Sequence, residues 1–257
     1  MRFASLGSGS MGNGLVFETG ATQLLLDCGF RVTDTVARLA RLGIAPETLS
    51  GVLVTHEHGD HADGVFPFAR RFGVPVWLTH GTLAVLRAAK PQVDAGVRVT
   101  LIDASTAFAI GDALVQPYPV PHDAREPAQF VFSDGNRRLG VLTDTGCSTP
   151  HIETTLSGCN GIVLECNHDA AMLAGGDYPP SLRARIAGRY GHLDNTASAA
   201  LLKNLDHSRL QHVIAAHLSL KNNTPELARA ALAGAMGCSR DWIGVATQDG
   251  GFAWRTI

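Results

Sequence analysis

One short turn in the sequence concentrates side chains that bind metal ions. His56, His58, Asp60 and His61 directly follow the apolar run GVLVT. In an extended chain His56 and His58 point to the same side. Gly59 then lets the backbone turn freely before Asp60 and His61. One pair can therefore face one ion and the other pair a second ion. Imidazole and carboxylate ligands without thiolate suit zinc, manganese or iron.

Other apolar segments also end in a residue that can hold a metal. These ends are Asp27, His122, Asp144, His168 and His217. Because the end of a strand is rigid, ligands from several strand ends can converge without a costly ordering of loops. Added to His56 and His58, His122 would complete a set of three imidazole ligands. Added to Asp60 and His61, His217 would complete a set of two imidazoles and one carboxylate. Asp144 could bridge the two ions.

Turn residues and the spacing of apolar residues predict the elements that position these side chains. We expect strands to lead to Asp27 and to the histidine cluster, with helices between strands, and a hairpin at Asp134-Gly135. The last third alternates again, with strands at 161–167 and 212–219 and helices at 179–191, 195–205 and 224–237. This order predicts an α/β protein (α+β in some schemes), with two central mixed sheets and helices outside, in one domain over 1–257.

The glycine-rich loop GSGSMG near the start of the chain is expected to face the substrate. Its spacing matches that of dinucleotide-binding loops, but that fingerprint must open a helix, and here a strand follows. We therefore assign its polar residues Ser8, Ser10 and Asn13 as candidate contacts to substrate or to the metal ligands.

The composition restricts the class of protein without naming a partner. A formal net charge of -2 gives no general sign of a nucleic-acid or membrane-surface binder and leaves room for a local basic groove. Five cysteines without a CxxC pair argue against a disulfide framework or a structural zinc knuckle. No apolar stretch is long enough to span a bilayer, and no signal-peptide pattern is present, so we expect a cytoplasmic protein without a membrane partner.

The order of these ligand-type residues resembles that of the metallo-β-lactamase-fold superfamily over essentially the whole chain. The resemblance implies an αββα sandwich with a binuclear site at one edge of the two sheets. It assigns His56, His58 and His122 to the first metal and Asp60, His61 and His217 to the second, with Asp144 as the bridge. It also gives Asp27 the role of orienting a ligand through a hydrogen bond.

A narrower resemblance rests on the segments SLGSGSMGN, LLLDCG, THEHGDH, PHDA, GVLTDTG, ECNHD, YGHLDN and AHLSLKNN. In this order they are similar to the YycJ/WalJ group, described as nucleases related to ribonuclease Z and to the phosphonate-pathway cyclic phosphodiesterase. Met11 stands where a small residue is expected. The resemblance implies that His192 donates a proton, and it gives His168 no firm role.

These features predict a phosphodiesterase with two divalent ions (zinc or manganese, with iron possible), most simply an exonuclease for DNA or RNA. Asp60 would bind metal and orient the nucleophile, and His192 would protonate the departing oxygen. Arg183, Arg185 and Arg189 are candidates for a phosphate path, although a solvated helix face explains them equally well. The alternatives are a hydrolase of small cyclic phosphates, thioesters or lactones, and a metal-stabilised regulatory scaffold without turnover. The sequence leaves the oligomeric state open, a dimer included.

Overall fold

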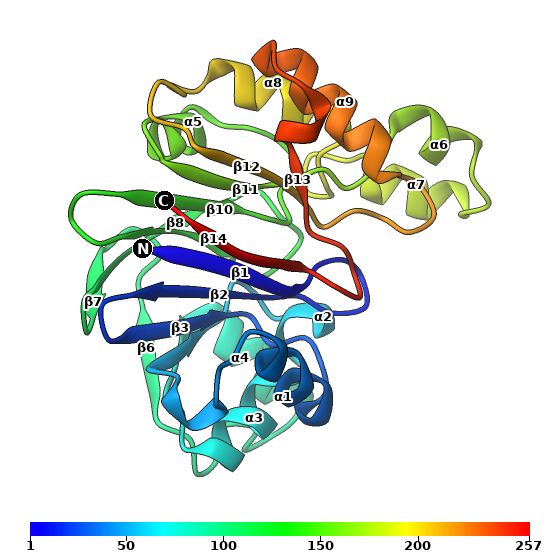
Figure 1. The fold of residues 1–257 in the computed structure, drawn as a ribbon. Coiled ribbons are helices and arrows are strands. Elements are labelled where there is room, and N and C mark those ends of the chain that lie inside the picture. The colour runs from blue at the N-terminus through cyan, green and yellow to red at the C-terminus, as the bar shows by residue number, and fades with distance from the viewer.

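Two seven-stranded mixed sheets lie face to face in the computed structural model, which describes residues 1–257 (Figure 1). The first sheet has the order β14-β1-β2-β3-β4-β5-β6. Its strands are β1 (Arg2–Gly7), β2 (Gly14–Thr19), β3 (Thr22–Leu26), β4 (Gly51–Leu53), β5 (Val76–Thr79), β6 (Val99–Ile102) and β14 (Phe252–Thr256). Because β1 pairs with β14, the two chain ends lie side by side.

The second sheet has the order β13-β12-β11-β10-β9-β8-β7. Its strands are β7 (Phe108–Ile110), β8 (Ala113–Pro119), β9 (Ala128–Ser133), β10 (Arg138–Leu142), β11 (Gly161–Glu165), β12 (His212–Ala216) and β13 (Gly244–Val245). The predicted hairpin at Asp134-Gly135 joins β9 to β10, and Gly135 has the left-handed φ of 91° that such a turn requires.

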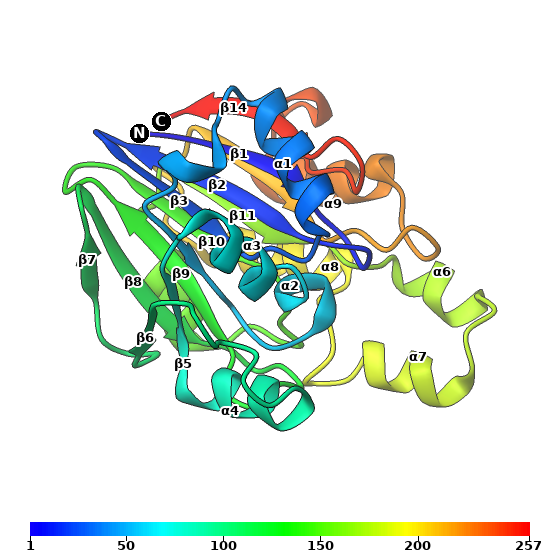
Figure 2. The same ribbon diagram turned by 90° about the horizontal axis from the view of Figure 1, so that it is seen from below.

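Helices cover the outer face of each sheet (Figures 1 and 2). Those beside the first sheet are α1 (Val32–Arg41), α2 (Gly59–Ala62), α3 (Val65–Phe72) and α4 (His80–Ala89). Those of the second half are α5 (Pro150–Leu156), α6 (Ala170–Gly175), α7 (Pro180–Ile186), α8 (Asn195–Asn204) and α9 (Pro225–Met236). Two 3-10 turns, η1 (Pro46–Thr48) and η2 (Arg240–Trp242), complete the elements.

Three apolar clusters separate these four layers. The central cluster fills the space between the sheets, where the rings of Phe17 and Phe132 stack with their centroids 4.8 Å apart. A second cluster joins the second sheet to α5, α8 and α9, and a third joins the first sheet to α1, α3 and α4. The predicted αββα sandwich is therefore confirmed.

The predicted helix at 224–237 ends as its sequence indicates. Thr224 caps the first turn through the Leu227 N–H, Pro225 takes the first helical position, and Gly237 ends the helix with a φ of 61°. The helix predicted over 179–191 is present as α7 but is shorter, because it ends at Ile186, whose carbonyl accepts the His192 N–H.

Helices α5 and α6 were not predicted from the sequence. Together α6 and α7 form an arm that projects beyond the sheets (Figure 2). No helix in the structure has the length and apolar character that crossing a membrane requires.

Candidate metal centre

The candidate site lies at one edge of the sandwich, where several strands end. Strands β3 and β4 run parallel, as do β10, β11 and β12, so their carboxyl ends meet at the same edge. The turn after β4 approaches the chain after β3 so closely that a Cβ on Gly29 would lie 1.8 Å from the Asp60 carbonyl oxygen. Glycine at position 29 therefore lets the two strand ends pack together.

The first group of ligand-type side chains consists of His56, His58 and His122. Their candidate ligand atoms lie within 4.8 Å of one another. The Nε2 of His122 is 3.3 Å from the Nδ1 of His58, and the rings of His56 and His122 have centroids 4.9 Å apart. The structure thus brings together the three imidazoles that the sequence assigned to one ion.

Hydrogen bonds place the ring proton of His56 and of His122 on Nδ1. The Thr55 hydroxyl donates to Asp27, so it can only accept from the Nδ1 of His56, at 2.9 Å. The Nδ1 of His122 likewise has the Gly191 carbonyl oxygen as its partner, at 3.1 Å. In both residues Nε2 is then the unprotonated nitrogen, the arrangement typical of metal-binding histidines.

A second group consists of Asp60, His61 and His217. The Oδ2 of Asp60 is 3.4 Å from the Nε2 of His61 and 3.3 Å from the Nε2 of His217. Asp144 lies between the two groups, since its Oδ2 is 3.0 Å from the His61 Nε2 and its ligand atoms also cluster with His56.

These donors fit divalent metal ions. The Nε2 of His56 is buried without a hydrogen-bond partner. An unpaired buried polar atom costs free energy, and a cation bound between the two groups would supply the missing partner. Imidazole and carboxylate are also the ligand types that zinc, manganese and iron accept.

The carboxylates of this edge hold protons on two of its histidines. Burial alone would lower the pKa of His61, but the charges of Asp144 and Asp27 raise it well above its usual value. Burial would also lower the pKa of His217, but the nearby carboxylates of Asp144 and Asp60 raise it to about 10. A bound metal ion has to replace these protons, so binding is coupled to proton release.

Asp27 makes the contact that its predicted role requires. Its Oδ2 lies 2.8 Å from the Nδ1 of His61, and its Oδ1 accepts the Thr55 N–H at 2.8 Å. The carboxylate therefore turns the Nε2 of His61 toward Asp60 and Asp144.

Backbone strain accompanies three of the predicted site residues. Asp27, Asp144 and His217 have φ values of 60°, 54° and 54°, in the left-handed region that non-glycine residues rarely adopt. All three directly follow or nearly follow a strand, so the strained residue turns its side chain into the edge. The surrounding hydrogen bonds must offset the cost, which is of order 1–3 kcal/mol for each residue.

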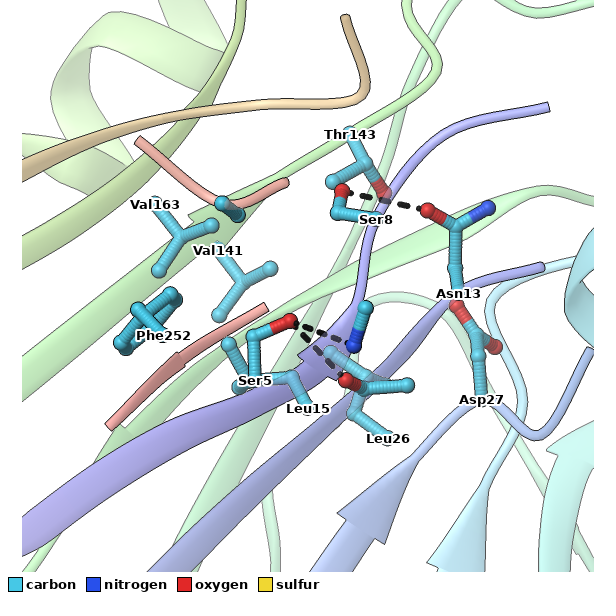
Figure 3. Close-up of a pocket in the computed structure, with 13 residues that line it drawn as sticks. Ser5, Ser8, Asn13, Leu15, Leu26, Asp27, Val141, Thr143, Val163 and Phe252 are labelled. Carbon is cyan, nitrogen blue, oxygen red and sulfur yellow. Dashed lines mark hydrogen bonds between the residues drawn. The ribbon is translucent and has the colours of Figure 1, made fainter. Parts of the chain in front are cut away.

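The glycine-rich loop supports the second group from behind. The Ser8 hydroxyl accepts the His217 N–H at 2.9 Å, and the Asn13 amide donates to the Asp60 Oδ2 at 3.2 Å. Ser8 and Asn13 are buried and bonded to each other, as Figure 3 shows. They therefore hold ligand-type residues in place, while the exposed Ser10 is the member of the loop that lines the open pocket.

Behind this loop lies a small cavity of about 20 Å³ between the sheets (Figure 3). Its lining is mixed: Ser5, Ser8, Asn13, Asp27 and Thr143 are polar, and Val141, Val163 and Phe252 are among the apolar residues. Its size admits no substrate, so we assign the binding of substrate to the pocket on the other side of the metal groups.

That open pocket has a volume of about 370 Å³. One wall is the sheet edge with His58, Asp60, Asp144, His192 and His217, and the other is the arm with Tyr178, Leu182, Arg185 and Ile186. Of the three arginines proposed for a phosphate path, Arg185 lines the pocket. Arg183 donates to the Ala174 carbonyl instead, and Arg189 does not line the pocket.

The interpretation of the sequence missed two acidic residues of this region. Glu165, at the end of β11, has its Oε1 2.7 Å from the Nδ1 of His192 and accepts the Thr145 N–H. Asp123 lies in the pocket, where its Oδ2 pairs with the Nε of Arg185 at 2.6 Å. The strand-end pattern that identified the other ligands also fits Glu165, but His168 was taken as the end of that segment.

His168 is buried away from the pocket. Its backbone carbonyl accepts the Asn195 N–H, and its Nδ1 has no partner. It belongs neither to the pocket lining nor to the metal-type groups, so a substrate or metal role for His168 finds no geometric support.

Comparisons with known proteins agree with this geometry. Residues 22–217 match a family model described as a β-lactamase superfamily domain. Exodeoxyribonuclease YycJ of Bacillus anthracis is 35% identical over 231 residues, which cover 89% of this chain and 86% of that protein. Exodeoxyribonuclease WalJ of Streptococcus pneumoniae is 32% identical over 230 residues, which cover 88% of this chain and 85% of that one.

Among solved structures, the metallo-β-lactamase fold protein YhfI from Bacillus subtilis superimposes with a TM-score of 0.74. It is 15% identical, and the match covers 99% of each chain, so it supports the fold alone. The predicted family is therefore confirmed: the chain belongs to the metallo-β-lactamase-fold superfamily and, within it, to the YycJ/WalJ group.

Proposed function

We propose that this protein is a divalent-metal-dependent phosphodiesterase that degrades DNA as an exonuclease. The observation that carries this proposal is the convergence of two ligand groups on Asp144 at the base of a pocket that also contains His192. The names of the YycJ and WalJ relatives support DNA as the substrate. Both sheets contribute to the site, so we take residues 1–257 as one catalytic domain.

We propose two ions, zinc or manganese, with the ligands that the sequence assigned. The first would be held by His56, His58 and His122, and the second by Asp60, His61 and His217, with Asp144 between them. When bound, two such ions generate a nucleophile from water near neutral pH and neutralise the charge that develops on a phosphoryl group.

Asp60 is suited to orient the attacking water. Its Oδ2 contacts the second group, and the side chain remains partly exposed and lines the pocket. Burial would raise the pKa of Asp60, but the charges of His61 and His217 lower it strongly. The carboxylate is therefore ionised at neutral pH and can accept a hydrogen bond from the nucleophile.

His192 is suited to protonate the departing oxygen. Glu165 engages its Nδ1, so Nε2 is the nitrogen left for a substrate in the pocket. Burial lowers the pKa of His192, but the charge of Glu165 outweighs this and raises it above the usual value. A histidine that is protonated near neutral pH can act as a general acid.

The test is cleavage of 5′-labelled single- and double-stranded DNA and RNA by the purified protein with Mn²⁺ or Zn²⁺. We expect stepwise shortening of DNA from one end and no cleavage by Asp60→Asn. Turnover of a small cyclic phosphate without DNA cleavage would contradict the nuclease assignment, and no turnover on any substrate would favour the scaffold.

A further inference from the structure

The rim of the open pocket combines one cation with an aromatic ring from two distant parts of the chain. The Lys221 ammonium lies 5.2 Å from the centroid of the Tyr178 ring. Tyr178 belongs to the connection between α6 and α7, and Lys221 to the loop that follows β12 and His217. The loop of Lys221 is also tied to the start of α6, since the Asp169 N–H donates to the Asn222 carbonyl oxygen at 2.8 Å.

Lys221 forms no ion pair and no hydrogen bond through its side chain, so its ammonium is free to meet an anion. Arg185 is already paired with Asp123, and Arg183 donates to a carbonyl of α6. Lys221 is exposed, and Tyr178 is half-buried in the pocket wall. A phosphate that approaches the rim can therefore meet the Lys221 ammonium, and a flat ring can lie on Tyr178.

We propose that this rim, defined by Tyr178 and Lys221, binds single-stranded DNA and guides its end into the pocket. An aromatic ring stacks on nucleobases, and an ammonium meets a phosphate, which is the combination that single-stranded nucleic acids require. Only unpaired bases expose their faces, so a duplex gains little from these side chains. The choice of DNA as the ligand rests on the proposed function, whereas the binding surface itself does not.

The test measures binding apart from cleavage, with fluorescein-labelled oligo(dT) and a blunt duplex in EDTA, by fluorescence anisotropy. Removal of the ring in Tyr178→Ala should weaken binding of oligo(dT) roughly tenfold, because stacking on one aromatic side chain is worth about 1–3 kcal/mol per base. Tyr178→Phe keeps the ring and should bind within about twofold of the unmodified protein. Circular dichroism checks that each variant is folded.

Lys221→Ala should weaken binding and make it less dependent on salt, with the slope reduced by about 0.7 for one lost phosphate contact. The matched control is Lys203→Ala, which removes a lysine at the end of α8, remote from the pocket lining. Unchanged binding by Tyr178→Ala, or an equal loss on the duplex, would overturn the inference.

Cleavage assays separate this inference from the proposed function. If Tyr178→Ala degrades DNA with the same KM as the unmodified protein, the nuclease function is supported and the role of the rim in binding is refuted. If the protein binds oligo(dT) through Tyr178 but cleaves no DNA with any metal, the role of the rim in binding is supported and the nuclease function is refuted. We expect the KM for oligo(dT) to rise more in Tyr178→Ala than the KM for bis(p-nitrophenyl) phosphate, which is too small to reach the rim.

Discussion

The strand-end edge and the α6–α7 arm face each other across one pocket, but they are built very differently. At the edge, His56 and His61 are completely buried, and the strained Asp27 and His217 are held by hydrogen bonds. In the arm, α7 has no buried residue and α6 has only Leu173. In the proposed function, chemistry is thus placed where packing fixes every atom, and recognition of substrate where side chains can adapt.

Removal of the metal ions should have the largest effect and should act on the edge alone. Dialysis against EDTA is expected to reduce DNA cleavage to background, and addition of Mn²⁺ or Zn²⁺ to restore it. Free metal at about 100 times its Kd should raise the free energy of unfolding by about 3 kcal/mol. Thermal unfolding with and without metal measures this, and an unchanged Tm would refute a metal centre in the edge.

The next largest effect is expected for His192→Ala. Loss of a general acid should lower kcat by roughly 10²–10⁴-fold while metal content stays the same. Single-turnover cleavage and metal analysis of the same preparation give both quantities. If the variant loses its metal, His192 is a ligand and the assigned role is wrong.

Asp27→Ala should weaken metal binding without removing a proposed ligand. Asp27 holds the Nδ1 of His61 at 2.8 Å, and loss of such an orienting partner typically costs 10- to 100-fold in metal affinity, as an order of magnitude. Titration with Zn²⁺ against a competing chelator measures the change. Metal affinity equal to that of the unmodified protein would show that packing alone orients the ring of His61.

The smallest effect is expected in the arm. Arg185→Ala breaks an ion pair with Asp123 that is largely solvent-exposed, and such pairs contribute about 0–1 kcal/mol. We therefore expect a nearly unchanged Tm and a several-fold higher KM for DNA, of the size of one lost phosphate contact. Arg183→Ala is the matched control on the same helix. A large fall in Tm would show that the arm is packed as rigidly as the strand-end edge, which would contradict the difference between the two regions.

Much of the site could be predicted because metal chemistry restricts residue types. The turn His56–His61 carries its ligands at fixed spacing, and each remaining predicted ligand follows a recognisable apolar strand. Glu165 fits the same strand-end pattern, but it was missed because the segment was taken to end at His168. The roles of Ser8 and Asn13 as supports for His217 and Asp60 depend on contacts across the sandwich, which no local pattern records.

Local patterns were enough to predict the two sheets, the cap and end of α9, the hairpin at Asp134-Gly135 and the identity of the ligand-type residues. These patterns are the period of apolar residues, turn chemistry and the few side chains that bind metal. Other features emerge only when the chain is folded: the left-handed backbone at Asp144 and His217, the contact of Glu165 with His192, and the contact of Tyr178 with Lys221. Each of these joins segments far apart in the chain, and their packing, rather than any local preference, fixes the geometry.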